Sequence, residues 1–89
     1  MIVREAILDD VPALVQLAHG YFEENAQWSN LTFSAENAAR SAVCRIMSDD
    51  SFVLVVGDCI GVAVVSMDTR MTVEPIAFEE MFYIHKSHR

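Results

Sequence analysis

Two apolar runs in the second half of the chain constrain the fold more than any other feature. The runs cover residues 52–56 and 59–67, and both are rich in β-branched residues. Only Gly57 and Asp58 separate them, which predicts two antiparallel strands joined by a tight two-residue turn. Because both runs are apolar at nearly every position, we expect the strands to be covered on both faces, with helices on one side.

Helical periodicity precedes this hairpin. Apolar residues recur at intervals of three and four in a segment that predicts a helix over about 10–24. Asp9 is placed to accept hydrogen bonds from the free amides of its first turn. A second helix is predicted over 34–48, with Ser34 as its cap and Glu36 and Arg40 as an i, i+4 ion pair.

Two further strands complete the expected order. Residues 2–5 form a short first strand, and residues 77–84 form a last strand that alternates apolar and polar side chains. The order β-α-α-β-β-β predicts one α/β (α+β) domain over 1–89, with two helices and a mostly antiparallel four-stranded sheet. By strand alternation, one face of the last strand is expected to carry Glu79, Met81, Tyr83 and His85.

The charge balance narrows the class of partner. Six Lys and Arg against thirteen Asp and Glu give a net charge of −7 over 89 residues, of which 53% are hydrophobic. Such a chain is globular, and it repels nucleic acid and anionic lipid. It favours cationic partners such as small amines.

The cysteines and the apolar runs indicate in which cellular compartment the protein is expected. Cys44 and Cys59 lack C-x-x-C spacing and are interpreted as small buried hydrophobes in a reducing compartment; the alternatives are a disulfide or a metal site. Arg4 and Glu5 follow the first apolar residues at once, so no secretory segment is expected. The apolar run over 60–65 is too short to span a membrane. We therefore expect a cytoplasmic protein without membrane contact.

Four segments, in their order and spacing, carry a resemblance to a known family. They are residues 2–6, residues 8–18, the hairpin halves 52–55 and 59–63, and the final stretch 79–89. Together they resemble the N-terminal half of the GNAT superfamily, the acyl-CoA dependent N-acetyltransferases. The resemblance spans the whole chain and implies half of a GNAT fold, with acetyl-CoA as cofactor and an amine as acceptor.

The resemblance also implies how the cofactor is held. In the family, the fourth strand runs into a Q/R-x-x-G-x-G/A loop whose backbone amides hold the CoA pyrophosphate at a helix N-terminus. Arg89 matches the first position of this loop, and the glycines do not follow within the sequence. Backbone groups around Ile84 are expected to pair with the pantetheine arm. Catalysis by this truncated half alone is not expected.

Candidate catalytic and substrate-binding residues follow from the same resemblance. A carboxylate, acting through a water, must take a proton from the acceptor ammonium group. Glu79 stands at the matching place, ten residues before Arg89, and Glu80 competes for the same role; the alternative is that Glu79 is a solvated edge-strand carboxylate. The predicted acceptor wall consists of Tyr21, Glu24 and Trp28, although Trp28 also fits a partly exposed packing role.

A non-catalytic function is the second interpretation. Without a fifth strand, the strand over 77–84 becomes an edge with unpaired backbone groups, which predicts a homo-oligomer or a protein partner at this edge. The chain would then be a binding module or an inhibitor, for example one encoded by a mobile element. His85 and His88 have an i, i+3 spacing, but beside a strand end they are interpreted as part of a solvated turn rather than a metal site.

Overall fold

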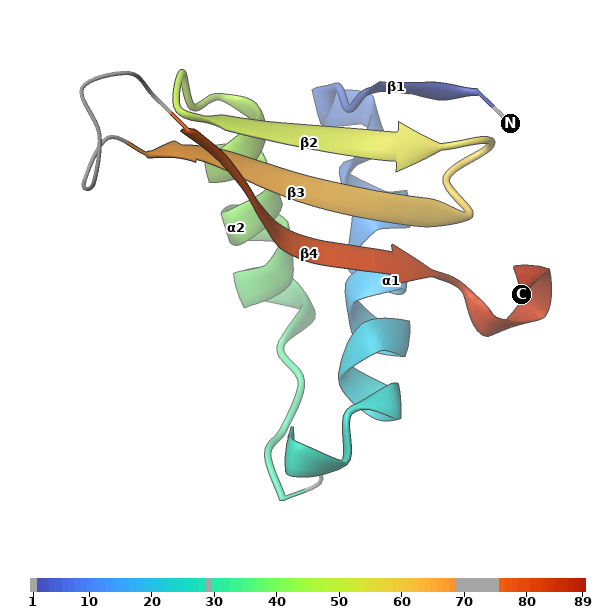
Figure 1. Cartoon of the computed structure of the whole chain (residues 1–89). Helices are drawn as coiled ribbons and strands as arrows, with labels where there is room; N and C mark the ends of the chain where they lie inside the picture. The colour runs from blue at the N-terminus through green and yellow to red at the C-terminus, as the bar shows by residue number, and fades with distance from the viewer. Residues whose placement is uncertain (1, 29, 69–75) are drawn as a thin grey trace.

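The predicted element order is confirmed in the computed structural model. The structure describes residues 2–28, 30–68 and 76–89, with the backbone alone for residues 26, 68 and 76–80. Its helices and strands are β1 (Val3–Glu5), α1 (Val11–Glu24), α2 (Ala35–Ile46), β2 (Ser51–Val56), β3 (Gly61–Asp68) and β4 (Ile76–Ile84) (Figure 1). Short 3-10 turns cover Leu8–Asp10, Ala26–Trp28 and Lys86–His88.

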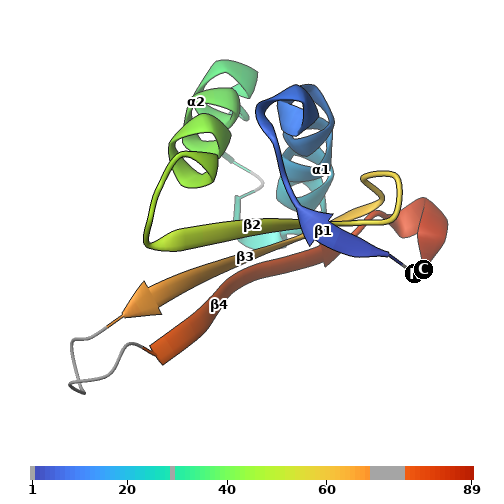
Figure 2. The same cartoon turned by 90° about the horizontal axis from the view of Figure 1, so that it is seen from above.

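The strands form one antiparallel sheet in the order β1-β2-β3-β4. Both helices cover the same face of this sheet (Figure 2). The α+β class, the antiparallel pairing and the position of the helices were therefore predicted correctly.

The turn between β2 and β3 differs from the prediction. The prediction of a two-residue turn at Gly57 and Asp58 is wrong, because Val56 lies opposite Gly61 and four residues connect the strands. Gly57 and Cys59 both adopt left-handed backbone conformations, with φ of 58° and 62°. This wider turn takes Cys59 out of the strand and places its thiol 3.7 Å from a carboxylate oxygen of Asp10.

The helix starts show one error and one success. The helix α1 begins at Val11, and Asp9 lies in the preceding 3-10 turn instead of at the cap. The residue at the cap position is Asp10, whose side chain accepts from the Ile7 amide at 2.9 Å and makes no capping bond to α1. Ser34 does cap α2, because its hydroxyl accepts from the Asn37 amide at 3.1 Å.

The surface of α2 bears out one prediction and contradicts another. Arg40 and Glu36 form the predicted ion pair at 3.1 Å. Both cysteines are free thiols, but Cys44 is exposed rather than buried, and Cys59 is half-buried. None of the described helices combines the length and hydropathy that a membrane span requires.

A single core lies between the sheet and the two helices. Its buried members are Ala6, Leu14, Leu17, Val53, Val55, Val62 and Tyr83. Strand alternation then turns Phe52 and Phe82 toward the other face, where they are 40% and 57% exposed. The expectation that both faces are covered therefore holds only for the helix side of the described chain.

The last strand contains a β-bulge and forms an edge of the sheet. Val64 lies opposite Met81 and Val65 lies opposite Glu79, so Glu80 is an extra residue on β4. The unbroken alternation assumed for Glu79 and Met81 is interrupted at this point. Within the described residues β4 pairs with β3 alone, as predicted for an edge strand.

Candidate acceptor site at the end of β4

The residue at the centre of the candidate site is Tyr83, on the helix-facing side of β4. Its side chain is only 7% exposed, and its hydroxyl donates a hydrogen bond to Oε2 of Glu24 at the end of α1. The other oxygen of that carboxylate, Oε1, accepts from the guanidinium of Arg89. We call Tyr83, Glu24 and Arg89 the Tyr83 cluster.

A glycine in α1 makes room for this cluster. A Cβ at Gly20 would lie 2.7 Å from the Tyr83 hydroxyl oxygen, closer than two such atoms can approach. Glycine inside a helix costs about 1 kcal/mol relative to alanine. Here it allows the helix and the tyrosine to come close enough for Glu24 to accept a hydrogen bond from the hydroxyl.

The protonation states of the cluster follow from its contacts. The pKa of Glu24 lies below its ordinary value because the Tyr83 hydroxyl, and after it the Arg89 guanidinium, stabilise the charged carboxylate. The pKa of Tyr83 is raised, first by burial and then by its hydrogen bond to Glu24 and the charge of that carboxylate. At neutral pH, Glu24 is therefore an anion and Tyr83 a neutral donor.

Aromatic rings continue from the cluster along α1. The Tyr21 ring packs edge-on against the rings of both Tyr83 and Trp28, each at 5.6 Å between centroids. Trp28 in turn stacks on Phe22 at 5.6 Å. The Arg89 guanidinium lies 5.8 Å from the centre of the Tyr83 ring, a cation–π distance.

The structure brings four of the predicted site residues together. Tyr21 and Glu24 contact Tyr83 near the end of β4, Arg89 reaches the same place from the C-terminal turn, and Trp28 joins them through its contact with Tyr21. Trp28 is half-buried and also fills the packing role that was its alternative. Sequence reasoning missed Tyr83, although a tyrosine on a buried strand face was a usable signal because its hydroxyl needs a partner.

The two candidate bases lie at the bulge of β4. Their register is described, with Glu79 opposite Val65 and Glu80 as the extra residue, but their side chains lie outside the described part. Bulges are frequent beside active sites, where they redirect side chains and backbone groups. The catalytic roles of Glu79 and Glu80 stay predictions.

The backbone groups of Ile84 face the open edge of β4, and their contact with a pantetheine arm stays a prediction. The His85 amide donates to the Ile60 carbonyl at 2.8 Å across the β3–β4 pair. Since backbone groups of an antiparallel strand point alternately toward and away from the partner, the N–H and C=O of Ile84 face the open edge. The Arg89 guanidinium, by contrast, is neutralised by Glu24.

The histidine pair at the chain end belongs to a turn. Nδ1 of His85 lies 2.7 Å from the Ser87 hydroxyl, and residues 86–88 form a 3-10 turn. Among the residues with described side chains, no three His, Cys, Asp or Glu are arranged to hold a metal ion.

No family model and no curated protein sequence matches this chain. Among solved structures, an integron cassette protein from the mobile metagenome of Cole Harbour Salt Marsh has a TM-score of 0.84 at 21% identity, covering 98% of this chain and 58% of that one. A candidate acetyltransferase from Agrobacterium tumefaciens has a TM-score of 0.74 at 15% identity, covering 100% and 62%. A GNAT-family acetyltransferase from Streptococcus pneumoniae has a TM-score of 0.56 at 16% identity, covering 98% and 56%.

The chain has a GNAT-like fold. At these identities the likeness concerns the fold alone, and the chain spans between 56% and 62% of the lengths of these three proteins. Within the GNAT-like fold, the Tyr83 cluster joins the end of α1 to the end of the edge strand β4.

Proposed function

We propose that this chain is a GNAT-type N-acetyltransferase-like domain that holds a small cationic amine beside β4. The observation that carries the proposal is the contact of both Tyr21 and Glu24 with Tyr83, to which Trp28 is joined through Tyr21. These contacts occur one residue from Ile84, whose backbone groups face the open edge. The proposed acceptor wall therefore meets the strand edge that would face acetyl-CoA.

The charges of the site favour an ammonium group. Glu24 stays ionised because its pKa is lowered by its two donors, and the net charge of the chain is −7. The rings of Tyr21 and Trp28 add surfaces that attract cations. Arg89 is half-exposed, so an incoming ammonium group can share the Glu24 carboxylate with it.

The proposed chemistry assigns different tasks to the carboxylates. When bound, acetyl-CoA supplies the acetyl group as a thioester. The acceptor nitrogen must first lose a proton, and we assign that step to Glu79, with Glu80 as the alternative, acting through a water. Glu24 serves to attract and orient the amine, since a lowered pKa makes it a weak base.

The 89 residues hold three glycines, none in a Gly-x-Gly stretch. A pyrophosphate loop of the form Q/R-x-x-G-x-G/A starting at Arg89 would need such a stretch. We therefore propose that these residues by themselves do not turn over acetyl-CoA. We also propose a cytoplasmic location, where the free thiols of Cys44 and Cys59 stay reduced.

Calorimetry with acetyl-CoA tests the proposal. Binding at micromolar concentration in the calorimeter would support the acetyltransferase function. An NMR titration with acetyl-CoA should in addition shift the amide resonances of Phe82 and Ile84 on the open edge of β4. Amides of β1 serve as the control, since this strand lies at the opposite edge of the sheet. An absence of binding would remove the support for a donor site in this stretch of chain.

A second candidate function rests on the uncovered sheet. Phe52 and Phe82 are exposed on the face away from the helices, and β4 has an unpaired edge within the described chain. We infer, as the alternative, a protein-binding module or an inhibitor, in line with the structural likeness to an integron cassette protein. Self-association or partner binding without acetyl-CoA binding would favour this alternative.

A further inference from the structure

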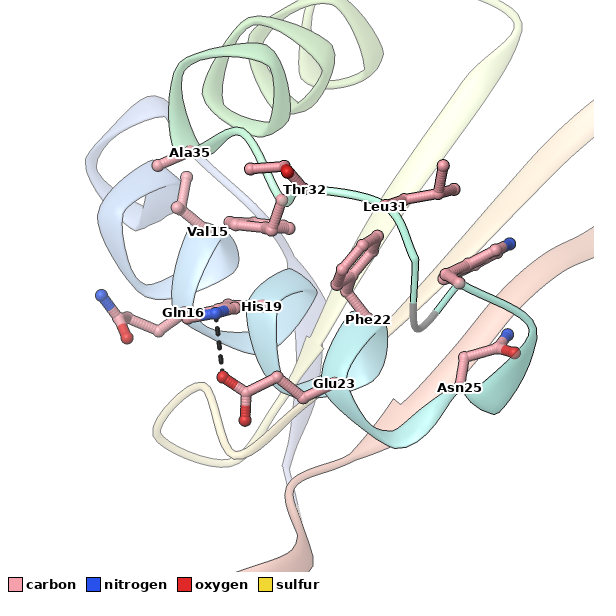
Figure 3. A pocket seen from close by; sticks show the side chains of 11 residues that line it. Val15, Gln16, His19, Phe22, Glu23, Asn25, Leu31, Thr32 and Ala35 are labelled. Carbon is pink, nitrogen blue, oxygen red and sulfur yellow. Dashed lines mark ion pairs between the residues drawn. The ribbon is translucent and has the colours of Figure 1, made fainter.

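A hollow lies on the other side of α1 from the Tyr83 cluster. It has a volume of about 830 Å3 and is bounded by α1 and the segment that leads to α2 (Figure 3). Its walls include His19, Phe22, Glu23, Trp28, Leu31 and Phe33. We call it the outer pocket. Its volume falls in the range of small-molecule sites, roughly 300–1,000 Å3.

Aromatic rings form much of the wall of the outer pocket. His19 stacks on Phe33 with 4.6 Å between ring centroids, and Phe22 stacks on Trp28 at 5.6 Å. Phe22 and Phe33 are also in contact, at 5.6 Å. Together with Tyr21 and Tyr83 these rings make one continuous series, which we call the ring row: His19, Phe33, Phe22, Trp28, Tyr21 and Tyr83. The faces of such rings attract cations.

A carboxylate, Glu23, lies beside His19 at the rim of the outer pocket. Glu23 is 61% exposed and lies 2.9 Å from Nε2 of His19, as the dashed line in Figure 3 marks. No Lys or Arg occurs among the described residues that line the hollow. An anion would therefore meet a carboxylate without a compensating lysine or arginine, whereas an ammonium group would meet a partner.

We propose that the outer pocket binds a small organic cation with an apolar or aromatic body. The body packs against Phe22 and Trp28, and the charged group lies at Glu23. This site goes beyond the proposed acetyl transfer. It lies on the Glu23 side of α1 and shares Trp28 with the proposed acceptor wall. The adjacent residues Glu23 and Glu24 serve different sites, because Glu24 contacts Tyr83 and Arg89 while Glu23 contacts His19.

Titration with 2-phenylethylammonium chloride tests the proposal on the unmodified chain. Trp28 is the single tryptophan, so its indole N–H gives one assignable NMR resonance in the wall of the pocket. We expect a saturable shift of this resonance and of the Glu23 amide. The neutral analogue 2-phenylethanol should bind about tenfold more weakly, because it lacks both the charge and the cation–π attraction. Equal affinity for the two compounds, or no saturation, would overturn the proposal.

A pair of neighbouring substitutions separates this pocket from the Tyr83 cluster. Glu23→Gln keeps the shape of an exposed side chain and should weaken binding of the cation by about threefold to fivefold. Glu5→Gln on β1 removes the same charge away from the pocket and should leave the affinity unchanged to within about twofold. Glu24→Gln is measured beside Glu23→Gln, because Glu24 belongs to the proposed acceptor site. If Glu24→Gln weakened binding and Glu23→Gln did not, the cation would lie at the Tyr83 cluster and the proposal would fail. The acetyl-CoA titration addresses the proposed function separately.

Discussion

Asp10 shows how much one buried side chain can hold together. It is 9% exposed and accepts from both guanidinium nitrogens of Arg4, at 2.7 and 2.9 Å, and from the Ile7 amide. The Cys59 thiol approaches the same carboxylate from the β2–β3 turn. One residue therefore connects β1, the start of α1 and the hairpin.

The stability of the chain should depend on the ionisation of Asp10. The hydrogen bonds from Arg4 and then from Ile7 hold its pKa well below the ordinary value of 3.8. A lowered folded-state pKa contributes stability above the unfolded value, and that stability is lost as the pH falls below it. We expect the urea midpoint to decrease between about pH 5 and pH 2.

Asp10→Asn should remove most of this pH dependence. It should also lower the free energy of unfolding at neutral pH by about 1–3 kcal/mol, since Arg4 and the Ile7 amide lose a charged acceptor. Asp9→Asn is the matched control, because Asp9 is exposed. An unchanged acid limb in Asp10→Asn would show that another carboxylate is responsible.

At the scale of elements, the contact between α1 and β4 depends on the fit of Gly20 to Tyr83. Alanine is favoured over glycine in a helix by about 1 kcal/mol, yet a Cβ here would meet the Tyr83 oxygen at 2.7 Å. The next nearest ring atom, Cζ, would be at an ordinary 3.5 Å. The steric conflict thus concerns one oxygen atom.

The effect of Gly20→Ala on the free energy of unfolding should therefore have opposite signs in the wild type and in Tyr83→Phe. In the wild type we expect it to lower the free energy of unfolding, because the buried ring has to move. In Tyr83→Phe we expect it to raise stability by up to about 1 kcal/mol. A double-mutant cycle from urea unfolding measures this coupling, and additive effects would show that the two residues do not touch.

The cap of α2 makes a simpler prediction. Ser34→Ala should lower the free energy of unfolding by about 1 kcal/mol, since the Asn37 amide loses its acceptor. Ser34→Asp should retain the wild-type value. Thermal unfolding of both variants checks the cap, and equal losses would indicate a role for Ser34 other than capping.

How well the sequence predicted each element depended on how local its cause is. The Ser34 cap and the Glu36–Arg40 pair involve neighbours along one helix, and both were predicted. The prediction for the turn after β2 was wrong because Cys59, which has a left-handed backbone conformation, lies beside Asp10. These two residues are 49 positions apart in the sequence. Tyr83 was missed for the same reason, since its partner Glu24 is 59 residues away.

The roles of the candidate site residues stay predictions. The resemblance placed Tyr21, Glu24 and Trp28 around an acceptor; in the structure Tyr21 and Glu24 contact Tyr83 of β4, and Trp28 contacts Tyr21. The bulge at Glu80 was not predicted, because a one-residue irregularity in a strand leaves no mark on an apolar pattern. The outer pocket likewise depends on how the segment after α1 folds back.

At the scale of the whole molecule, the described residues cover the sheet on its helix side only. The helices bury the face of Val53, Val55 and Tyr83, while Phe52 and Phe82 remain exposed on the other. An apolar face beside an unpaired edge strand favours association between sheets.

We expect the chain to self-associate at high micromolar concentration. Phe82→Lys should shift sedimentation toward the monomer, because a charge at the open edge opposes pairing of two β4 strands. Ile7→Lys is a control, since Ile7 is another exposed apolar residue that lies outside the sheet. A stable wild-type monomer at this concentration would contradict the expectation.

The ring row also has an optical consequence. It contains both tyrosines and the single tryptophan, and Tyr21 lies 5.6 Å from each of the other two. Light absorbed by either phenol should therefore pass to the indole before it is re-emitted. The fluorescence emission spectrum of the folded chain should therefore show tryptophan emission alone. Tyrosine emission should return when unfolding separates the rings.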